Sequence, residues 1–123
     1  MKKTVLTVDD SRTMRDMLLM ALEDAGYTVI QAVDGVDGLE TLAAKGADVV
    51  ITDINMPRMD GFGFIEGMRA DPNHRATPVL VLTTESDAEK KARARAAGAT
   101  GWIVKPFDPA RLVVALRTVT GLL

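Results

Sequence analysis

Five polar residues of the sequence each follow a short apolar run, and together they could carry phosphoryl chemistry: Asp9, Asp10, Asp53, Thr83 and Lys105. Carboxylates packed together repel one another unless a cation lies among them. Hard oxygen ligands of this kind suit Mg²⁺, which binds a few carboxylates together with water and phosphate oxygens. The lysine adds a point charge for carboxylate or phosphate oxygens, and the threonine adds a hydroxyl donor. Such a set could hold a phosphoryl group in transit between a donor and a carboxylate nucleophile.

The predicted elements should bring these five side chains together. Apolar runs typical of buried strands cover residues 5–8, 28–32, 49–52, 79–82 and 102–104. Helical spacing predicts helices between Ser11 and Gly26, over about 36–45, from about 62 to 70, over about 87–97 and from about 109. Strands that are apolar throughout and alternate with helices predict an α/β fold, with a five-stranded parallel sheet covered on both faces by five helices. Parallel strands end at one edge, where ligands bind, so the five polar residues should converge there.

Each of these residues has an ordinary structural explanation when it is taken alone. An aspartate after a strand is more often a cap or turn residue, Thr83 fits the end of a strand, and Lys105 fits a solvated surface. Their joint occurrence at the ends of the first, third, fourth and fifth strands is harder to obtain by chance. The set therefore favours a functional site over five independent structural roles.

Composition narrows the class of protein. The 123 residues fit one domain, residues 1–123, with 47% hydrophobic and 26% charged residues, the ordinary globular balance. The absence of cysteine excludes disulfides, thiol catalysis and cysteine–zinc sites. A formal net charge of −2 weighs against nucleic acid as the main partner. No apolar run approaches the ~20 residues of a membrane span, so we expect a cytoplasmic protein without membrane insertion, and a monomer.

The motifs resemble the receiver domains of two-component response regulators, over essentially the whole chain. The matching residues are Asp9-Asp10, the segment Asp53-Ile54-Asn55-Met56-Pro57 with Asp60-Gly61, Thr83 and Lys105-Pro106. The length and the expected lack of an output domain resemble the chemotaxis regulators of the CheY type. The resemblance implies a doubly wound sheet with strand order 2-1-3-4-5, for which flavodoxin and CheY are the standard examples.

The resemblance also implies a role for each residue of the acidic site. Asp53 is expected to be the phosphoacceptor. Asp10 and Asp53 are expected to bind Mg²⁺ directly, with a backbone carbonyl from Asn55, whereas Asp9 acts mainly through water. Lys105 is expected to bind the phosphoryl oxygens.

Further implied roles concern switching and the lifetime of the phosphoryl group. Thr83 is expected to move toward the phosphoryl group, and the Lys105–Pro106 peptide is expected to be cis. Asn55 and Glu85 occupy the positions expected to modulate dephosphorylation. Phosphohydrolases of the haloacid-dehalogenase type use Asp-x-Asp, whereas Asn55 cannot shuttle a proton at neutral pH. We therefore expect a slowly self-dephosphorylating switch and not a turnover enzyme.

The expected partner surface contains Thr83, Trp102, Lys91 and Arg95. Trp102 stands where the family commonly has a smaller aromatic residue that changes rotamer, and a buried indole needs a partner for its N–H. An aromatic anchor with a basic rim is typical of binding hot spots. The alternative for the helix over 87–97 is a solvated charged face with ion pairs such as Glu89–Arg93.

These expectations lead to one leading function and two alternatives. The leading function is a response regulator that accepts a phosphoryl group from a CheA-like histidine kinase and then binds a FliM-like flagellar motor switch protein. The alternatives are a phosphate sink or relay intermediate without motor binding, and a small Mg²⁺-dependent phosphohydrolase. Two lesser predictions are that His74 is an exposed loop residue and that Met14, Met17 and Met20 mostly fill the core.

Overall fold

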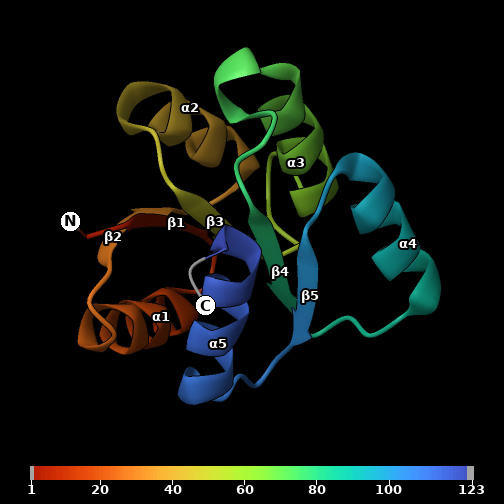
Figure 1. The fold of residues 1–123 in the computed structure, drawn as a ribbon. Helices are drawn as coiled ribbons and strands as arrows, with labels where there is room; N and C mark the ends of the chain where they lie inside the picture. The colour runs from red at the N-terminus through yellow and green to blue at the C-terminus, as the bar shows by residue number, and fades with distance from the viewer. Residues whose placement is uncertain (1, 122–123) are drawn as a thin grey trace.

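The computed structural model describes residues 2–121 and contains one sheet of five parallel strands in the order β2-β1-β3-β4-β5, as expected (Figure 1). The strands are β1 (Thr4–Val8), β2 (Thr28–Ala32), β3 (Val49–Thr52), β4 (Val79–Thr83) and β5 (Gly101–Val104). The helices are α1 (Arg12–Asp24), α2 (Gly35–Lys45), α3 (Gly61–Ala70), α4 (Ala88–Ala97) and α5 (Pro109–Thr120), with a 3₁₀ turn at Pro72–His74. All ten predicted elements are present, with ends that differ from the prediction by about one residue.

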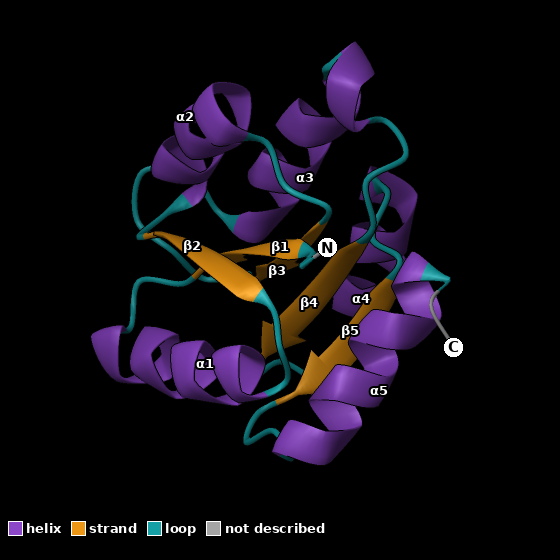
Figure 2. Cartoon of the chain, turned by 60° about the vertical axis from the view of Figure 1, so that its left-hand side comes forward, coloured by secondary structure: helices purple, strands orange, loops and turns teal. Residues whose placement is uncertain are grey.

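The helices cover both faces of the sheet, α1 and α5 on one face and α2, α3 and α4 on the other (Figure 2). Each face of the sheet has its own hydrophobic core, and alternate residues of a strand point into one core or the other. In β1, Val5 packs with Leu18 of α1 and Leu116 of α5, whereas Leu6 and Val8 pack in the other core. Because strands β1, β3 and β4 are buried on both faces, most of their side chains are apolar and the others are threonines.

The helices begin where the sequence supplies a side-chain acceptor for the first free backbone N–H groups. Ser11 caps α1 as predicted, since its hydroxyl accepts from the N–H of Met14. The other four α-helices are each capped by an aspartate that accepts from a first-turn N–H, namely Asp34, Asp60, Asp87 and Asp108. Gly98 ends α4 at a φ of 117°, a left-handed conformation that suits glycine. These local signals explain why the predicted helix ends were accurate.

Two of the lesser predictions were wrong. His74 is buried, with 8% of its surface exposed, because the 3₁₀ turn folds it back so that its Nδ1 lies 3.2 Å from Thr77 Oγ1. Met17 and Met20 are 46% and 69% exposed, and of the three methionines only Met14 packs against the core. Within residues 2–121, no helix is both long enough and apolar enough to cross a membrane.

Candidate functional site

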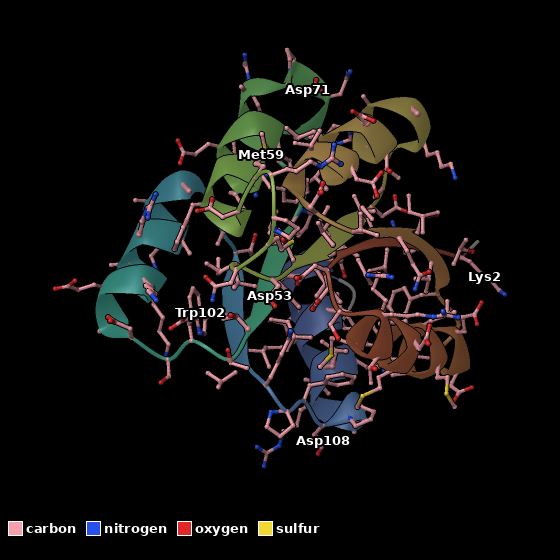
Figure 3. All side chains as sticks on the ribbon, turned by 180° about the vertical axis from the view of Figure 1, so that it is seen from behind. Lys2, Asp53, Met59, Asp71, Trp102 and Asp108 are labelled. Atoms are coloured by element: carbon pink, nitrogen blue, oxygen red, sulfur yellow. The ribbon has the colours of Figure 1, made fainter. Side chains whose placement is uncertain are left out.

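The carboxyl ends of β1 and β3 bring three carboxylates together, as the sequence predicted. Asp9 and Asp10 follow β1, and Asp53 follows β3. One carboxylate oxygen from each residue lies within 4.8 Å of the others. Figure 3 shows Asp53 near the centre of this edge, with Trp102 on the side of β5 and α4. The strand pairing explains the meeting, since Val8 pairs with Thr52 and the next residue of each strand carries a carboxylate.

Lys105 bridges two of these carboxylates. Its Nζ donates to Asp9 Oδ2 at 2.9 Å and to Asp53 Oδ2 at 2.8 Å. The lysine follows β5, and its backbone N–H donates to the carbonyl of Thr83 at 2.8 Å, which extends the pairing of β5 with β4 by one residue. The peptide bond from Lys105 to Pro106 is cis, as expected. The lysine side chain is only 12% exposed, and its ammonium contacts both carboxylates at the sheet edge.

Asp53 is held on both sides of its carboxylate. Oδ2 accepts from Lys105, and Oδ1 accepts from the N–H of Ile54 at 2.6 Å. Gly61 packs directly on the backbone behind it, because a Cβ on Gly61 would collide with the carbonyl oxygen of Asp53. The side chain of Asp53 is 12% exposed, so an incoming group can reach an otherwise fixed carboxylate.

Burial and pairing shift the pKa values of the bridged groups. Burial raises the pKa of the Asp9 carboxyl above its ordinary value, and hydrogen bonds from Lys105 and from the N–H of Ser11 offset only part of that effect. Burial acts against the charged ammonium of Lys105, but hydrogen bonds to Asp53 and Asp9 outweigh it and raise the pKa of Lys105. The ammonium therefore stays charged at neutral pH and partly neutralises the acidic cluster.

The donor set fits a divalent cation that prefers oxygen ligands. Asp10 is exposed and has no side-chain hydrogen bond to any other described residue, so its carboxylate is available. Both oxygens of Asp9 are engaged, Oδ1 by the N–H of Ser11 and Oδ2 by Lys105, which agrees with an indirect role for Asp9. The cluster offers three carboxylates as ligands, and oxygen ligands of this kind suit Mg²⁺.

Glu85 forms the opposite rim of the site. Its Oε1 accepts from Asn55 Nδ2 at 3.0 Å and lies 2.9 Å from Lys90 Nζ, so the two residues expected to modulate dephosphorylation are in contact. Hydrogen bonds from Lys90 and then from Asn55 lower the pKa of Glu85. The backbone N–H of Glu85 donates to Thr83 Oγ1 at 3.3 Å. Thr83 is therefore coupled to this rim and is fully buried, so it does not lie on the expected partner surface.

The remaining residues of the expected partner surface do lie together. Trp102, Lys91 and Arg95 line a small cavity of about 60 Å³ between α4 and β5. The indole of Trp102 is partly buried, and its Nε1 donates to the backbone carbonyl of Glu85 at 3.1 Å, which supplies the partner that a buried indole needs. On the other side of α4, the Arg93 guanidinium lies 4.1 Å from the ring centre of Phe62, and the expected pairing with Glu89 is not found among the described residues.

Two contacts near the site were missed in the sequence. Lys90 was assigned to a solvated face, but it pairs with Glu85. Arg58 and Asp34 were assigned no role, but they form an ion pair across 24 positions of sequence. The position of Asp34 before a glycine and an apolar helix was an available signal for a helix cap. No local signal identifies the partner of Arg58, because the pairing depends on how the two loops pack.

Comparisons with known proteins agree with this geometry. The family model described as the response regulator receiver domain matches residues 5–117. The chain is 40% identical over 119 residues to the chemotaxis protein CheY1 of Helicobacter pylori, covering 95% of this chain and 96% of that protein. The structure of the chemotaxis protein CheY4 of Vibrio cholerae is similar with a TM-score of 0.93 at 45% identity, covering 97% of this chain and 99% of that one.

A further neighbour bears on the cation. The receiver domain of the sensor histidine kinase PA1611 of Pseudomonas aeruginosa has a TM-score of 0.91 at 25% identity, with 98% of this chain and 99% of that one covered. That structure holds a magnesium ion coordinated in its active site cleft.

Proposed function

Because the chain belongs to the response regulator receiver domain family, we propose that it is a chemotaxis regulator of the CheY type that accepts a phosphoryl group from a histidine kinase on Asp53. The observation that carries the proposal is the bridge from Lys105 Nζ to Asp9 and Asp53 beside the exposed carboxylate of Asp10. It supports the proposal because the carboxylate of Asp53 lies beside an ammonium and two further carboxylates, which is what phosphoryl transfer to an aspartate would need. The protein acts as a switch and not as a turnover enzyme.

In the proposed reaction, a carboxylate oxygen of Asp53 attacks the phosphorus of the donor phosphohistidine. A phosphorus–oxygen bond forms, the phosphorus–nitrogen bond breaks, and the imidazole leaves with its electron pair and takes up a proton. Lys105 is already 2.8 Å from Asp53 Oδ2, so its ammonium is placed to compensate the charge of the phosphoryl oxygens. The Ile54 N–H holds the other carboxylate oxygen and fixes the direction of attack.

Asp10 and Asp53, with the backbone carbonyl of Asn55, are the residues that would hold Mg²⁺, and Asp9 would support it indirectly. When bound, the cation supplies positive charge that offsets the repulsion between these carboxylates and the incoming phosphoryl oxygens. Lys105 supplies one positive charge beside three carboxylates, so the site keeps a net negative charge unless a further cation binds.

Switching follows from the contacts of Thr83. Its hydroxyl now accepts from the N–H of Glu85, whose carbonyl accepts from Trp102 Nε1. A phosphoryl group on Asp53 offers the Thr83 hydroxyl a stronger acceptor. Movement of Thr83 then changes the Glu85 segment and alters the surface of Trp102, Lys91 and Arg95. The modification thereby shifts the population of a surface that binds a partner.

The proposed target is a flagellar motor switch protein. The test is binding of the N-terminal segment of such a protein, measured by fluorescence polarisation with and without Mg²⁺ and beryllofluoride, which mimics the phosphoryl group. We expect affinity to rise at least about tenfold in the loaded form, which corresponds to about 1.4 kcal/mol. The Asp53→Asn variant should show no such increase.

Two results would contradict the motor assignment. Equal binding with and without beryllofluoride would remove the switch from the proposal. Phosphorylation of Asp53 by a histidine kinase without any phosphorylation-dependent binding would favour a phosphate sink or a relay intermediate. Steady hydrolysis of a phosphate monoester over many turnovers would instead indicate a phosphohydrolase, which the amide at Asn55 disfavours.

A further inference from the structure

A pair of oppositely charged side chains joins two loops beside the acidic site. Arg58 lies in the loop between β3 and α3, and Asp34 is the N-cap of α2. Arg58 Nε donates to Asp34 Oδ2 at 2.7 Å, and Arg58 Nη2 donates to Oδ1 at 3.1 Å. The guanidinium thus contacts both carboxylate oxygens in a fixed planar arrangement, which the ammonium of a lysine cannot reproduce. We call this contact the Asp34–Arg58 fork.

The fork is unequally buried. The side chain of Asp34 is only 4% exposed, whereas that of Arg58 is 58% exposed. Hydrogen bonds from Arg58 and from the N–H of Asp37 hold the pKa of Asp34 below its ordinary range, so the buried carboxylate is charged. A buried carboxylate is costly unless it is paired and hydrogen-bonded. Asp34 therefore constrains where Arg58, and the loop that carries it, can lie.

The backbone at the fork is also unusual. Arg58 has a φ of 63°, and it is the one non-glycine residue with a positive φ in the described part of the chain. A residue with a Cβ stays in this conformation where its surroundings hold it there. A second contact does so, because the N–H of Gly35 donates to the carbonyl of Met59 at 3.1 Å (Met59 is labelled in Figure 3). A Cβ on Gly35 would lie 2.7 Å from that carbonyl oxygen, so the loop is seated directly on the first turn of α2.

The same loop carries the groups that orient Asp53. Its first peptide N–H, from Ile54, donates to Asp53 Oδ1 at 2.6 Å. The carbonyl of Ile54 accepts from the N–H of Gly61 at 2.8 Å, which closes the loop at its other end. Asn55, the next residue, contacts Glu85 on the opposite rim. Movement of the loop away from α2 would therefore disturb the N–H that holds the Asp53 carboxylate.

We propose that the Asp34–Arg58 fork is a positioning pair for the acidic site, holding the loop after Asp53 so that its carboxylate is oriented before a divalent cation binds. The inference rests on the proposed function and deepens it. Neither residue is proposed to touch the cation or the phosphoryl group. Groups behind metal ligands typically change affinity by about 10- to 100-fold. We expect the lower end, about tenfold, because the fork acts through the loop backbone.

The experiment compares Arg58→Ala, Arg58→Lys, Asp34→Asn and the double variant Asp34→Asn/Arg58→Ala with the wild-type chain. Asparagine keeps an acceptor for the N–H of Asp37, so Asp34→Asn preserves the cap of α2 while removing the charge. The matched control is Arg111→Ala, because Arg111 is 90% exposed and pairs at 4.0 Å with Asp108 at the start of α5. Two quantities are measured by NMR: hydrogen exchange of the Ile54 and Gly61 amides in the metal-free protein, and the dissociation constant for Mg²⁺ alone.

We expect Arg58→Ala and Asp34→Asn each to speed exchange of the Gly61 amide and to weaken Mg²⁺ binding about tenfold. The double variant should lose no more than either single variant, because one substitution already breaks the fork. Arg58→Lys should recover only part of the loss, and Arg111→Ala should match the wild type. Folded Arg58→Ala with unchanged exchange and unchanged Mg²⁺ affinity would overturn the proposal, even if its melting temperature fell.

The two proposals fail in different ways. The exchange measurement needs neither the cation nor a phosphodonor, so it decides on the fork by itself. Failure of the wild-type chain to be labelled on Asp53 would contradict the proposed function and would leave the measured effect of the fork on the loop unchanged.

Discussion

Replacement of Lys105 by methionine should change cation binding and phosphorylation in opposite directions. Methionine keeps the approximate length of the side chain but removes the ammonium that lies 2.8 Å from Asp53 Oδ2 and 2.9 Å from Asp9 Oδ2. The net charge of the three carboxylates and the lysine then falls from −2 to −3. A divalent cation that binds to the variant is no longer repelled by the ammonium, whereas a phosphoryl group on Asp53 loses its principal side-chain hydrogen-bond donor.

The magnitudes follow from the charges involved. In a water-like dielectric two unit charges about 4 Å apart interact by about 1 kcal/mol, so the ammonium would oppose a nearby divalent cation by about 1 to 2 kcal/mol. Removal of the ammonium should therefore tighten Mg²⁺ binding about tenfold. Loss of a donor that stabilises developing charge typically costs about 100- to 1,000-fold in rate. The metal-free protein should also lose about 3 kcal/mol of unfolding free energy, since removal of the ammonium leaves the buried Asp9 carboxylate without its compensating charge.

The assay combines a Mg²⁺ titration followed by amide shifts with the initial rate of labelling by acetyl phosphate. The control is Lys45→Met, because Lys45 lies beside Thr4 and Asp48 at the opposite edge of the sheet. Weaker Mg²⁺ binding in Lys105→Met would show that the ammonium supports the cation site and does not compete with it. Labelling at the wild-type rate would refute the assignment of Lys105 to the phosphoryl oxygens.

Three further predictions concern stability. Asp10→Asn should raise the melting temperature of the metal-free protein by about 4 °C, because it relieves repulsion among carboxylates whose oxygens lie within 4.8 Å of one another. The same variant should no longer be stabilised by Mg²⁺, and a melting temperature below that of the wild type would contradict the prediction. Hydrogen bonds, first from Arg58, lower the pKa of Asp34, so they stabilise the folded protein fully above the ordinary aspartate range, and this stability is lost as the pH falls through the lowered pKa. In urea unfolding below about pH 4, the unfolding free energy of Arg58→Ala should fall less steeply with pH than that of the wild type, and equal slopes would contradict this. Gly61→Ala should cost at least about 3 kcal/mol in the same assay, because its Cβ meets the backbone of Asp53, and a near-neutral effect would show that this contact relaxes easily.

The sequence predicted the sheet and the acidic site because both depend on strong local signals. The strands β1, β3 and β4 are buried on both faces, so their apolar runs are nearly continuous and are followed by polar residues. Asp9 and Asp53 directly follow such runs, and Lys105 follows the short run of β5, so locating the strands also located these residues. Parallel pairing then requires the strand ends to meet, and the register of Val8 with Thr52 does so.

The remaining features depend on packing between segments that are distant in sequence. Neither residue of the Asp34–Arg58 fork has a local pattern that predicts the other, since the fork exists only because the loop is seated on α2. The burial of His74 depends on the 3₁₀ turn and on Thr77. The need of Trp102 for a hydrogen-bond partner was predictable, but its identification as the Glu85 carbonyl required the arrangement of the β4–α4 segment.

The central claim is that Asp53 accepts the phosphoryl group, and intact-mass measurement after incubation with acetyl phosphate and Mg²⁺ tests it most directly. The wild-type chain should gain the mass of one phosphoryl group, and peptide mapping after borohydride trapping should place it on Asp53. The Asp53→Asn variant, which keeps the shape but not the nucleophile, should gain none. Labelling of Asp53→Asn to the wild-type extent would contradict the claim, whatever the Mg²⁺ affinity of the site.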